Sequence, residues 1–287
     1  MTETFESYRL LLFAIAYRML GSAMEAEDIV QETYLRYQAT PPDEIRSLKA
    51  FLSTVTTRLC IDYLKSAKAQ REAYFGTWLP EPIRTAQRTE DNADENTLDM
   101  FNESLSMAFL VLLEKLNPLE RAVFLLREVF EYDFAEIGSM VGKPETACRK
   151  ALQRARQAIH AEKARFHSTP EEHRTIFSKF IQAYTVGDLT GLVAVLAEDV
   201  TIWSDGGGKA SAATHPIVGR ERVIAFIMGL MRRAPSNITI EFPEINGRMG
   251  MVVRRDGVVV VTLLADVEAG QITALRFIRN PDKLQHV

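Results

Sequence analysis

The clearest hydrophobic period in the chain runs through Asp133–Ile159. In its first half the apolar positions Phe134, Ile137 and Val141 share one face of a helix. Gly142 can take the left-handed backbone that ends a helix, and Pro144 suits the first position of the next one. The second half repeats apolar residues at helical spacing: Cys148, Leu152, Ala155 and Ile159. The pattern predicts two short helices joined by a tight turn.

The other face of the second predicted helix is polar and cationic. It carries Arg149, Lys150, Gln153, Arg154 and Arg156. This layout is that of a helix-turn-helix, whose second helix enters the major groove and contacts base edges with Arg, Lys and Gln. An ordinary helical hairpin with a solvated cationic face is the alternative. We therefore expect DNA contact from these five side chains.

Residues 1 to about 75 show three further helical patterns. They cover Phe5–Leu20, Met24–Gln38 and Ser47–Gln70, and they are separated by Gly21-Ser22 and by a loop that opens at Pro41-Pro42. The early part of the middle helix is acidic, through Glu25, Glu27, Asp28 and Glu32, with the polar Gln31 among them. Such acids suit a helix N-terminus. They form either a solvated face or a surface that binds a protein partner.

The Ser47–Gln70 helix has the opposite charge. Six cations lie on it or directly beside its ends, and Asp62 is the single acid among them: Arg46, Lys49, Arg58, Lys65, Lys68 and Arg71. Phe51, Tyr63 and Tyr74 lie among or beside them. Cations neutralise phosphates and aromatic rings stack on unpaired bases, so this composition fits a single-stranded nucleic-acid surface.

The charge of the predicted helix-turn-helix differs in sign from that of the whole chain. The whole chain of 287 residues has a net charge of −4, whereas the stretch Lys143–Arg165 has seven cations against two acids. A local basic patch on an acidic chain indicates a localised polyanion contact. The fractions of 47% hydrophobic and 25% charged residues are those of a soluble globular protein. The N-terminus lacks the cationic segment of a secretory signal, and Leu10–Tyr17 is too short to span a bilayer.

These features predict a cytoplasmic protein without membrane contact. Cys60 and Cys148 lack partners at metal-ligand spacing, so we expect no metal and no cofactor. Residues 76–97 form an acidic linker with Pro80 and Pro82, and its Trp78 needs an apolar partner. Helices follow at Leu98–Leu116 and from Asn117-Pro118 onward.

The third segment, residues 170–287, has a different pattern. Helices are expected at Glu171–Val186, Asp188–Ala197 and Gly219–Arg233, with a strand at Val200–Trp203. The remaining strands are expected at Ile238–Phe242, Met249–Arg255, Val258–Val267 and Ile272–Ile278, with a hairpin turn at Asp256-Gly257. Helices followed by a curled antiparallel sheet predict an α+β cone.

Three stretches of residues 1–166 together resemble bacterial sigma factors of the extracytoplasmic-function (ECF) group: DIVQETYLRYQ, AFLSTVTTRLCIDYLKSAK and LNPLERAVFLLREVFEYDFAEIGSMVGKPETACRKALQRARQAI. The resemblance implies that residues 1–75 are sigma region two and residues 98–166 are region four. Core RNA polymerase would then be the partner, contacted at its β′ clamp helices and β flap.

The same resemblance implies a role for each candidate residue. Asp28, Gln31 and Glu32 would bind the clamp helices. Arg58, Lys65 and Lys68 would engage the minus-ten promoter element, and the helix-turn-helix would read the minus-thirty-five element. Phe51 stands where this group often has Trp, so it implies only weak support for strand separation.

The C-terminal segment resembles the SnoaL-like, NTF2-like superfamily. Together with Trp78–Pro82, two of its stretches resemble signatures of sigma factors with a SnoaL-like extension: Asp205, Gly206, Gly207, Gly208, Lys209; and Asn280, Pro281, Asp282, Lys283, Leu284. In that family the extension acts in cis, without a separate membrane anti-sigma partner. The resemblance implies regulatory contacts by these residues and by Trp78.

The expected fold class is therefore two all-α modules followed by an α+β NTF2-like cone. The expected function is that of an ECF sigma factor tuned in cis, and the alternative is a one-component regulator whose SnoaL-like domain senses an unknown small ligand. An isomerase-like site could use Asp205, His215 and Trp203 in an apolar pocket. Three glycines after Asp205 make a flexible loop rather than a fixed base, so we expect no catalytic residues and no enzyme.

Overall fold

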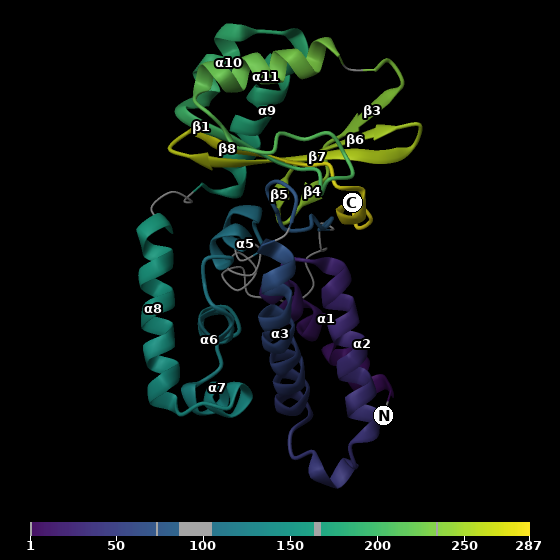
Figure 1. Ribbon diagram of the computed structural model, residues 1–287, viewed down its shortest axis with the longest axis vertical. Coiled ribbons are helices and arrows are strands. Elements are labelled where there is room, and N and C mark those ends of the chain that lie inside the picture. The colour runs from purple at the N-terminus through teal and green to yellow at the C-terminus, as the bar shows by residue number, and fades with distance from the viewer. Residues whose placement is uncertain (1, 73, 86–104, 164–167, 234) are drawn as a thin grey trace. The chain divides into compact units, whose positions relative to one another are not determined.

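The computed structural model describes residues 2–72, 74–85, 105–163, 168–233 and 235–287 (Figure 1). The chain folds into two compact units. Among the described residues, the first unit contains 2–72, 105 and 109–162, and the second contains 106–108, 163 and the C-terminal part from residue 168. Residues 74–85 belong to the second unit; they comprise the last two residues of the expected region two and the described part of the expected 76–97 linker, and are called the linker from here on. The expectations for residues 86–104 and 164–166 lie outside the described residues.

Three helices begin the first unit: α1 (Thr2–Leu20), α2 (Ala23–Ala39) and α3 (Leu48–Glu72), with a short 3₁₀ turn η1 (Pro42–Glu44) before α3. Ser22 starts α2 by accepting a hydrogen bond from the Glu25 amide. The three helices share a buried core of Phe5, Leu12, Val30 and Leu52. The buried hydroxyls of Thr33 and Thr56 lie 3.1 Å apart and join α2 to α3.

The helices that follow, which lie mostly in the first unit, are α5 (Met107–Leu113), α6 (Pro118–Glu128), α7 (Phe134–Val141) and α8 (Glu145–Lys163). Asn117 and Asp133 start α6 and α7 with capping boxes, completed by Glu120 and Glu136. Gly142 ends α7 at φ 65°, as the sequence predicts. Pro144 lies one position before α8 begins and accepts hydrogen bonds from the Ala147 and Cys148 amides.

Within this unit the N-terminal helices pack against the later ones. The buried hydroxyls of Ser53 on α3 and Tyr132, in the loop before α7, lie 2.8 Å apart. Arg121 of α6 is also buried, and its Nη1 donates to the Met19 carbonyl over 2.6 Å. A buried polar group needs such partners, because an unpaired one costs about 1–3 kcal/mol.

The C-terminal part of the second unit starts with α9 (Pro170–Val186) and α10 (Leu189–Val195), and α11 (Arg220–Arg232) follows two strands. Its strands are β1 (Leu196–Asp205), β2 (Ile217–Val218), β3 (Ile238–Glu241), β4 (Glu244–Ile245), β5 (Arg248–Met249), β6 (Met251–Arg255), β7 (Val258–Glu268) and β8 (Gln271–Ile278). A 3₁₀ turn, η2 (Pro281–Lys283), lies near the end. The Asp256-Gly257 turn has φ 51° and 81°, which is the predicted hairpin geometry.

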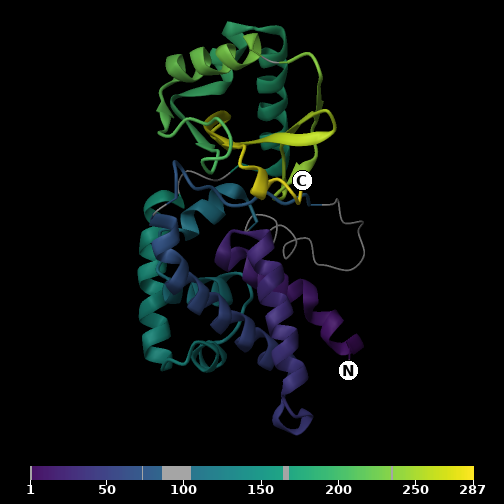
Figure 2. The ribbon, with the colours of Figure 1, turned by 45° about the vertical axis from the view of Figure 1, so that its right-hand side comes forward.

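Six strands form one sheet in the order β2-β1-β8-β7-β6-β3, while β4 and β5 form a separate hairpin. Figures 1 and 2 show α9, α10 and α11 gathered over one face of the sheet. Apolar residues fill the space between them, among them Phe177, Phe180, Val223, Leu263 and Phe277. The α+β cone is confirmed.

One detail of the expected sheet is wrong. The sheet is not wholly antiparallel, because β1 pairs with β8 in parallel. The two strands are separated in sequence by α11 and four strands of the sheet, so their pairing requires a long crossover rather than a hairpin.

Candidate functional site

Helix α8 presents the cationic face that its sequence predicts. Cys148, Ala151, Leu152 and Ala155 are buried along one side. The five predicted DNA-binding residues are exposed: Arg149, Lys150, Gln153, Arg154 and Arg156. This helix has one buried stripe and an exposed basic face, and it follows the left-handed residue Gly142. That is the geometry of a recognition helix.

Carboxylates of α6 hold two of these arginines. Arg154 Nε lies 2.6 Å from Glu120 Oε1, and Arg156 Nη2 lies 2.8 Å from Glu128 Oε1. Glu120 also completes the α6 capping box, so one side chain fixes the start of α6 and a candidate DNA-binding residue. Neither glutamate could be predicted as a partner from the sequence, because they precede their α8 partners by 34 and 28 residues.

A groove of about 480 Å³ lies beside α8 in the first unit. It is lined by Arg127, Phe134, Arg149, Leu152, Gln153, Arg156 and Gln157. The Phe134 ring lies under two guanidinium groups, with its centroid 4.2 Å from Cζ of Arg149 and 5.3 Å from Cζ of Arg127. Neither Phe134 nor Arg127 was among the predicted site residues.

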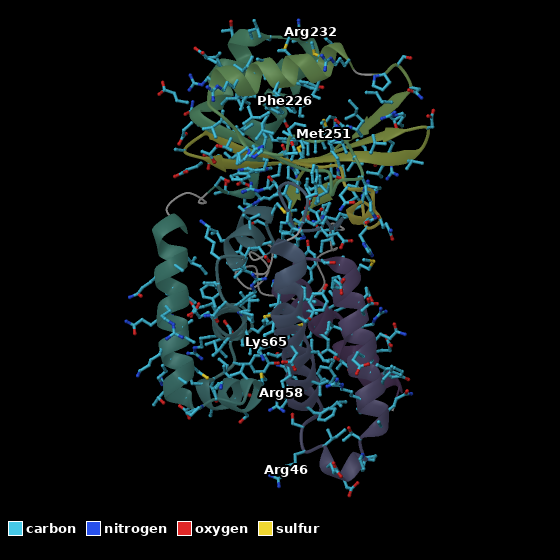
Figure 3. All side chains as sticks on the ribbon, viewed as in Figure 1. Arg46, Arg58, Lys65, Phe226, Arg232 and Met251 are labelled. Carbon is cyan, nitrogen blue, oxygen red and sulfur yellow. The ribbon has the colours of Figure 1, made fainter. Side chains whose placement is uncertain are left out.

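On α3 the predicted cations have different surroundings. Arg58 donates through Nε to the Met140 carbonyl and through Nη2 to the Ser139 carbonyl, each over 2.8 Å. Lys65 lies further along α3 and pairs with Asp62 at 3.0 Å (Figure 3). Lys68 lies on α3, but its side chain is outside the described part of the chain. Phe51 is half-buried against the α1–α3 core.

The acidic residues of α2 face outward. Asp28 and Gln31 are exposed, and Glu32 is partly exposed and pairs with Arg36 over 2.8 Å. Asp28 lies three positions before Gln31 and four before Glu32, so the three side chains lie near one another on the helix surface.

The structure brings the linker and both C-terminal motifs together around Asp205. This carboxylate is fully buried; Tyr74 Oη donates to its Oδ1 over 2.6 Å and the Leu79 amide donates to its Oδ2 over 2.9 Å. Lys283 Nζ lies 2.7 Å from Asp205 Oδ2 and 2.6 Å from the Leu79 carbonyl. Burial, followed by the Asp205 contact, raises the pKa of Tyr74 above its usual value.

Aromatic rings of the linker cover the same ammonium group. Lys283 Nζ lies 4.3 Å from the centroid of the Trp78 ring and 4.9 Å from that of Tyr74. Trp78 thus contacts a cation, the Lys283 ammonium group. Tyr74, predicted beside the basic helix, instead belongs to this cluster.

The glycines of the Asp205–Lys209 loop allow close approach. A Cβ at Gly206 would lie 2.2 Å from the Ala210 carbonyl oxygen, and one at Gly207 would lie 2.3 Å from Nδ2 of Asn280. Gly207 and Gly208 also have φ 57° and 71°. Lys209 pairs with Asp282, while Asn280 caps the η2 turn that includes Pro281 and precedes the buried Leu284.

A second set of contacts holds the linker further along. The Ile83 amide donates to Oδ1 of Asn246, and the Asn246 amide donates back to the Ile83 carbonyl. Arg84 pairs with Glu241 at 2.6 Å, and the buried Glu81 lies 2.7 Å from Nδ1 of His286. None of these partners was predicted from the sequence. Asn246-Gly247 is a turn signal, but it does not reveal which segment the turn will contact.

A groove of about 680 Å³ adjoins this second set. Its lining includes Arg84 and Thr85 of the linker with Arg174, Glu241, Arg248 and Met249 of the C-terminal part.

The isomerase-like set is not assembled: Asp205 is bound to the linker and Lys283, while His215 is exposed and bonds to Thr214. Within the described residues, no three His, Cys, Asp or Glu side chains could together hold a metal ion.

The described helices include none that is long and apolar enough to cross a membrane. A helix-turn-helix module, a second basic helical module and an α+β cone that holds the linker define a multidomain transcription factor. Models of known families match in the same order: sigma-70 region 2 matches residues 4–70, and sigma-70 region 4 matches residues 106–159.

Relatives match over nearly the whole chain. The ECF RNA polymerase sigma factor SigJ of Mycobacterium tuberculosis is 35% identical, over 97% of this chain and 91% of its own length. The probable sigma factor SigI of the same organism is 30% identical, over 99% and 94%. A crystal structure of M. tuberculosis SigJ matches with a TM-score of 0.79 and 33% identity, covering 100% of this chain and 99% of that one. The chain belongs to the ECF RNA polymerase sigma factor family.

Proposed function

We propose that this sigma factor binds core RNA polymerase through α2 and directs it to promoters through α3 and α8. The observation that carries the proposal is the exposed basic face of α8 within a sigma region 4, on a chain that also has region 2. The one-component regulator is not favoured, because relatives along the whole length are sigma factors.

The contact with polymerase is assigned to α2 by charge. Asp28, Gln31 and Glu32 offer an outward acidic and polar surface, which complements a basic partner. The β′ clamp helices are the proposed partner of this surface, and the β flap is the proposed partner of region four. Both assignments follow from the resemblance to ECF sigma factors.

For promoter DNA, α8 would read the minus-thirty-five element and α3 the minus-ten element. Arg58 adds a condition to this assignment. Its Nε and Nη2 donate to carbonyls of α7, so the same two donors cannot bind DNA until that contact opens. Lys65 has only an exposed pairing with Asp62, and such a pair contributes little to stability.

The extension is proposed to act in cis by holding residues 74–85. The support is two sets of hydrogen bonds to the linker backbone. Asp205 and Lys283 bind the Leu79 amide and carbonyl, and Asn246 binds the Ile83 amide. Backbone groups held there are not available to polymerase, so release of the linker would change how the sigma factor engages it. A small ligand in the groove of about 680 Å³ would meet Arg84 and Thr85 and could bias this release.

In vitro transcription with purified core polymerase tests the function. Core enzyme with this chain should give RNA from defined promoter start sites in a fragmented genomic library of the source organism. Core enzyme alone is the control. Start sites that do not depend on the chain would reject the assignment.

A further inference from the structure

Three helices meet at the side chain of Phe134. The residue begins α7 and is only partly buried. Its ring contacts Arg149 of α8 and Arg127 from the last turn of α6, at the distances of 4.2 and 5.3 Å given above. Arg127 is itself anchored, because its Nη1 donates to the Tyr132 carbonyl over 2.9 Å.

Arg149 differs from the other arginines of α8 in how it is held. Arg154 and Arg156 donate directly to carboxylates at 2.6 and 2.8 Å. Arg149 has only a 3.4 Å contact with Glu145, and 60% of its side chain is exposed. The guanidinium of Arg149 instead lies over the Phe134 ring, and its N–H groups are not consumed by a close carboxylate.

A guanidinium held over a ring loses rotational freedom before it meets DNA. Its donors lie in the plane of the group, which is the geometry needed for two hydrogen bonds to O6 and N7 of a guanine. Holding the group in advance removes part of the ordering cost of binding. We propose that Phe134 is a positioning residue that orients Arg149 for a guanine of the minus-thirty-five element. This inference rests on the proposed reading role of α8.

Substitution at Phe134 separates orientation from folding. The buried residues of α7 are Ile137, Gly138 and Met140, and the α7 cap is formed by Asp133 and Glu136. Phe134→Leu therefore removes the ring while leaving the helix core and the cap in place. Phe134→Tyr keeps the ring and is the conservative control.

The experiment uses the full chain with core polymerase and DNA randomised at the minus-thirty-five element. Arg149→Ala should weaken base preference at one position, by about five- to 150-fold. Phe134→Leu should weaken preference at that same position by about two- to fivefold, the range of an exposed cation–π contact. Phe134→Tyr should match the unchanged chain, and the double variant Phe134→Leu with Arg149→Ala should be no worse than Arg149→Ala alone.

The salt dependence of DNA affinity distinguishes a lost orientation of Arg149 from general damage to the DNA-binding surface. The slope of log affinity against log salt should stay unchanged in Phe134→Leu, because no phosphate contact is lost. A uniform loss of affinity across all sequences, or additive effects in the double variant, would overturn the inference.

Two further outcomes are distinguishable. If Phe134→Leu does not fold, as judged by its melting temperature, Arg149→Lys keeps the charge but not the flat stacked group and should show the same single-position loss. Full retention of preference in Arg149→Lys would then reject the stacking role. If Arg149→Ala itself leaves affinity and preference intact, the reading role of α8 fails instead, whatever Phe134 does.

Discussion

A carboxylate that solvent does not reach needs its charge compensated, and Asp205 obtains this from the linker and the C-terminal tail. Its Oδ2 receives the Leu79 amide and the Lys283 ammonium, while its Oδ1 receives the Tyr74 hydroxyl. The Lys283 side chain is 11% exposed, so neither charge is screened well by water. Three segments distant in sequence therefore depend on one another at a single residue.

Asp205→Asn should destabilise the second unit strongly. The change leaves the Lys283 ammonium buried without a counter-charge, which costs about 3–5 kcal/mol for pairs of this kind. Chemical unfolding of the full chain, followed by fluorescence of Trp78 and Trp203, measures the loss. Asp205→Asn combined with Lys283→Met is the matched comparison and should be less destabilised than Asp205→Asn alone. Greater destabilisation of the double variant would show that the ion pair is not what holds this cluster.

His173 makes the extension sensitive to acid. Burial lowers its pKa below 6.5, while the bond to the Ala265 carbonyl opposes this; Arg248 lowers it further and Asp266 raises it. Because Nε2 bonds to a carbonyl, it carries the proton in the neutral ring, and Nδ1 is buried without a hydrogen-bond partner. Protonation would place a charge on that buried nitrogen.

The sign of the pH dependence follows from this lowered pKa. The unfolded chain takes up the proton first as pH falls below about 6.5, so the contribution of His173 to stability is complete above that value and is lost below it. His173→Gln keeps a donor for Ala265 and cannot become charged. The melting temperature of the unchanged chain should fall more steeply than that of His173→Gln between about pH 7 and about pH 5. Parallel curves would contradict the prediction.

At the scale of the element, α2 is defined by its outward acidic side chains. Asp28→Arg with Glu32→Arg should weaken binding of core polymerase, by at least about tenfold if two charge contacts of about 1 kcal/mol each become repulsive. Titration of labelled chain with core enzyme measures the affinity. The arginine introduced in place of Glu32 would also face Arg36, so helix content is checked by circular dichroism.

The matched control carries the same charge change on another exposed acidic pair. Glu198→Arg with Asp199→Arg lies on β1 of the extension, where both residues are exposed. It should leave the affinity for core polymerase unchanged. Equal weakening by both double variants would indicate a general effect of net charge, and α2 would not be the binding surface.

Elements with local signals were predictable from sequence, and those that depend on distant partners were not. The helix-turn-helix was predicted because its signals, Gly142 and the apolar stripe of α8, lie within a few residues of one another. The β4–β5 hairpin was missed because two-residue strands show no alternation. The parallel partner of β1 was missed because β8 is contributed by the end of the chain.

The candidate site shows the same division. Exposure of the α8 cations could be predicted, because an amphipathic helix buries its apolar face. The contact of Arg58 with α7 could not, since its acceptors lie 81 and 82 residues away and backbone carbonyls leave no mark in the sequence. The residues around Asp205 were predicted as a group through family resemblance, but the burial of a charge pair among them was not.

At the scale of the molecule, the linker is held at two places that can be removed separately. In the C-terminal tail, Lys283 is hydrogen-bonded to Leu79 and His286 to Glu81. In the β4–β5 hairpin, Asn246 is hydrogen-bonded to Ile83 and Glu244 to Thr85. Residues 74–85 can therefore be released in stages. Ending the chain after Ile278 removes only the tail contacts, and removing residues 170–287 removes both sets.

Three chains test whether this holding matters: the full chain, one ending at Ile278 and one lacking residues 170–287. Hydrogen exchange should show the Leu79 amide less protected in the tail-deleted chain, because Asp205 loses its counter-charge, while the Ile83 and Thr85 amides stay protected by the hairpin. Without the whole extension all three amides should exchange rapidly. Transcription from one promoter with core polymerase should then differ among the three chains, with the tail deletion distinct from the full deletion. Equal output, together with the expected exchange differences, would mean that the extension holds the linker without influencing initiation.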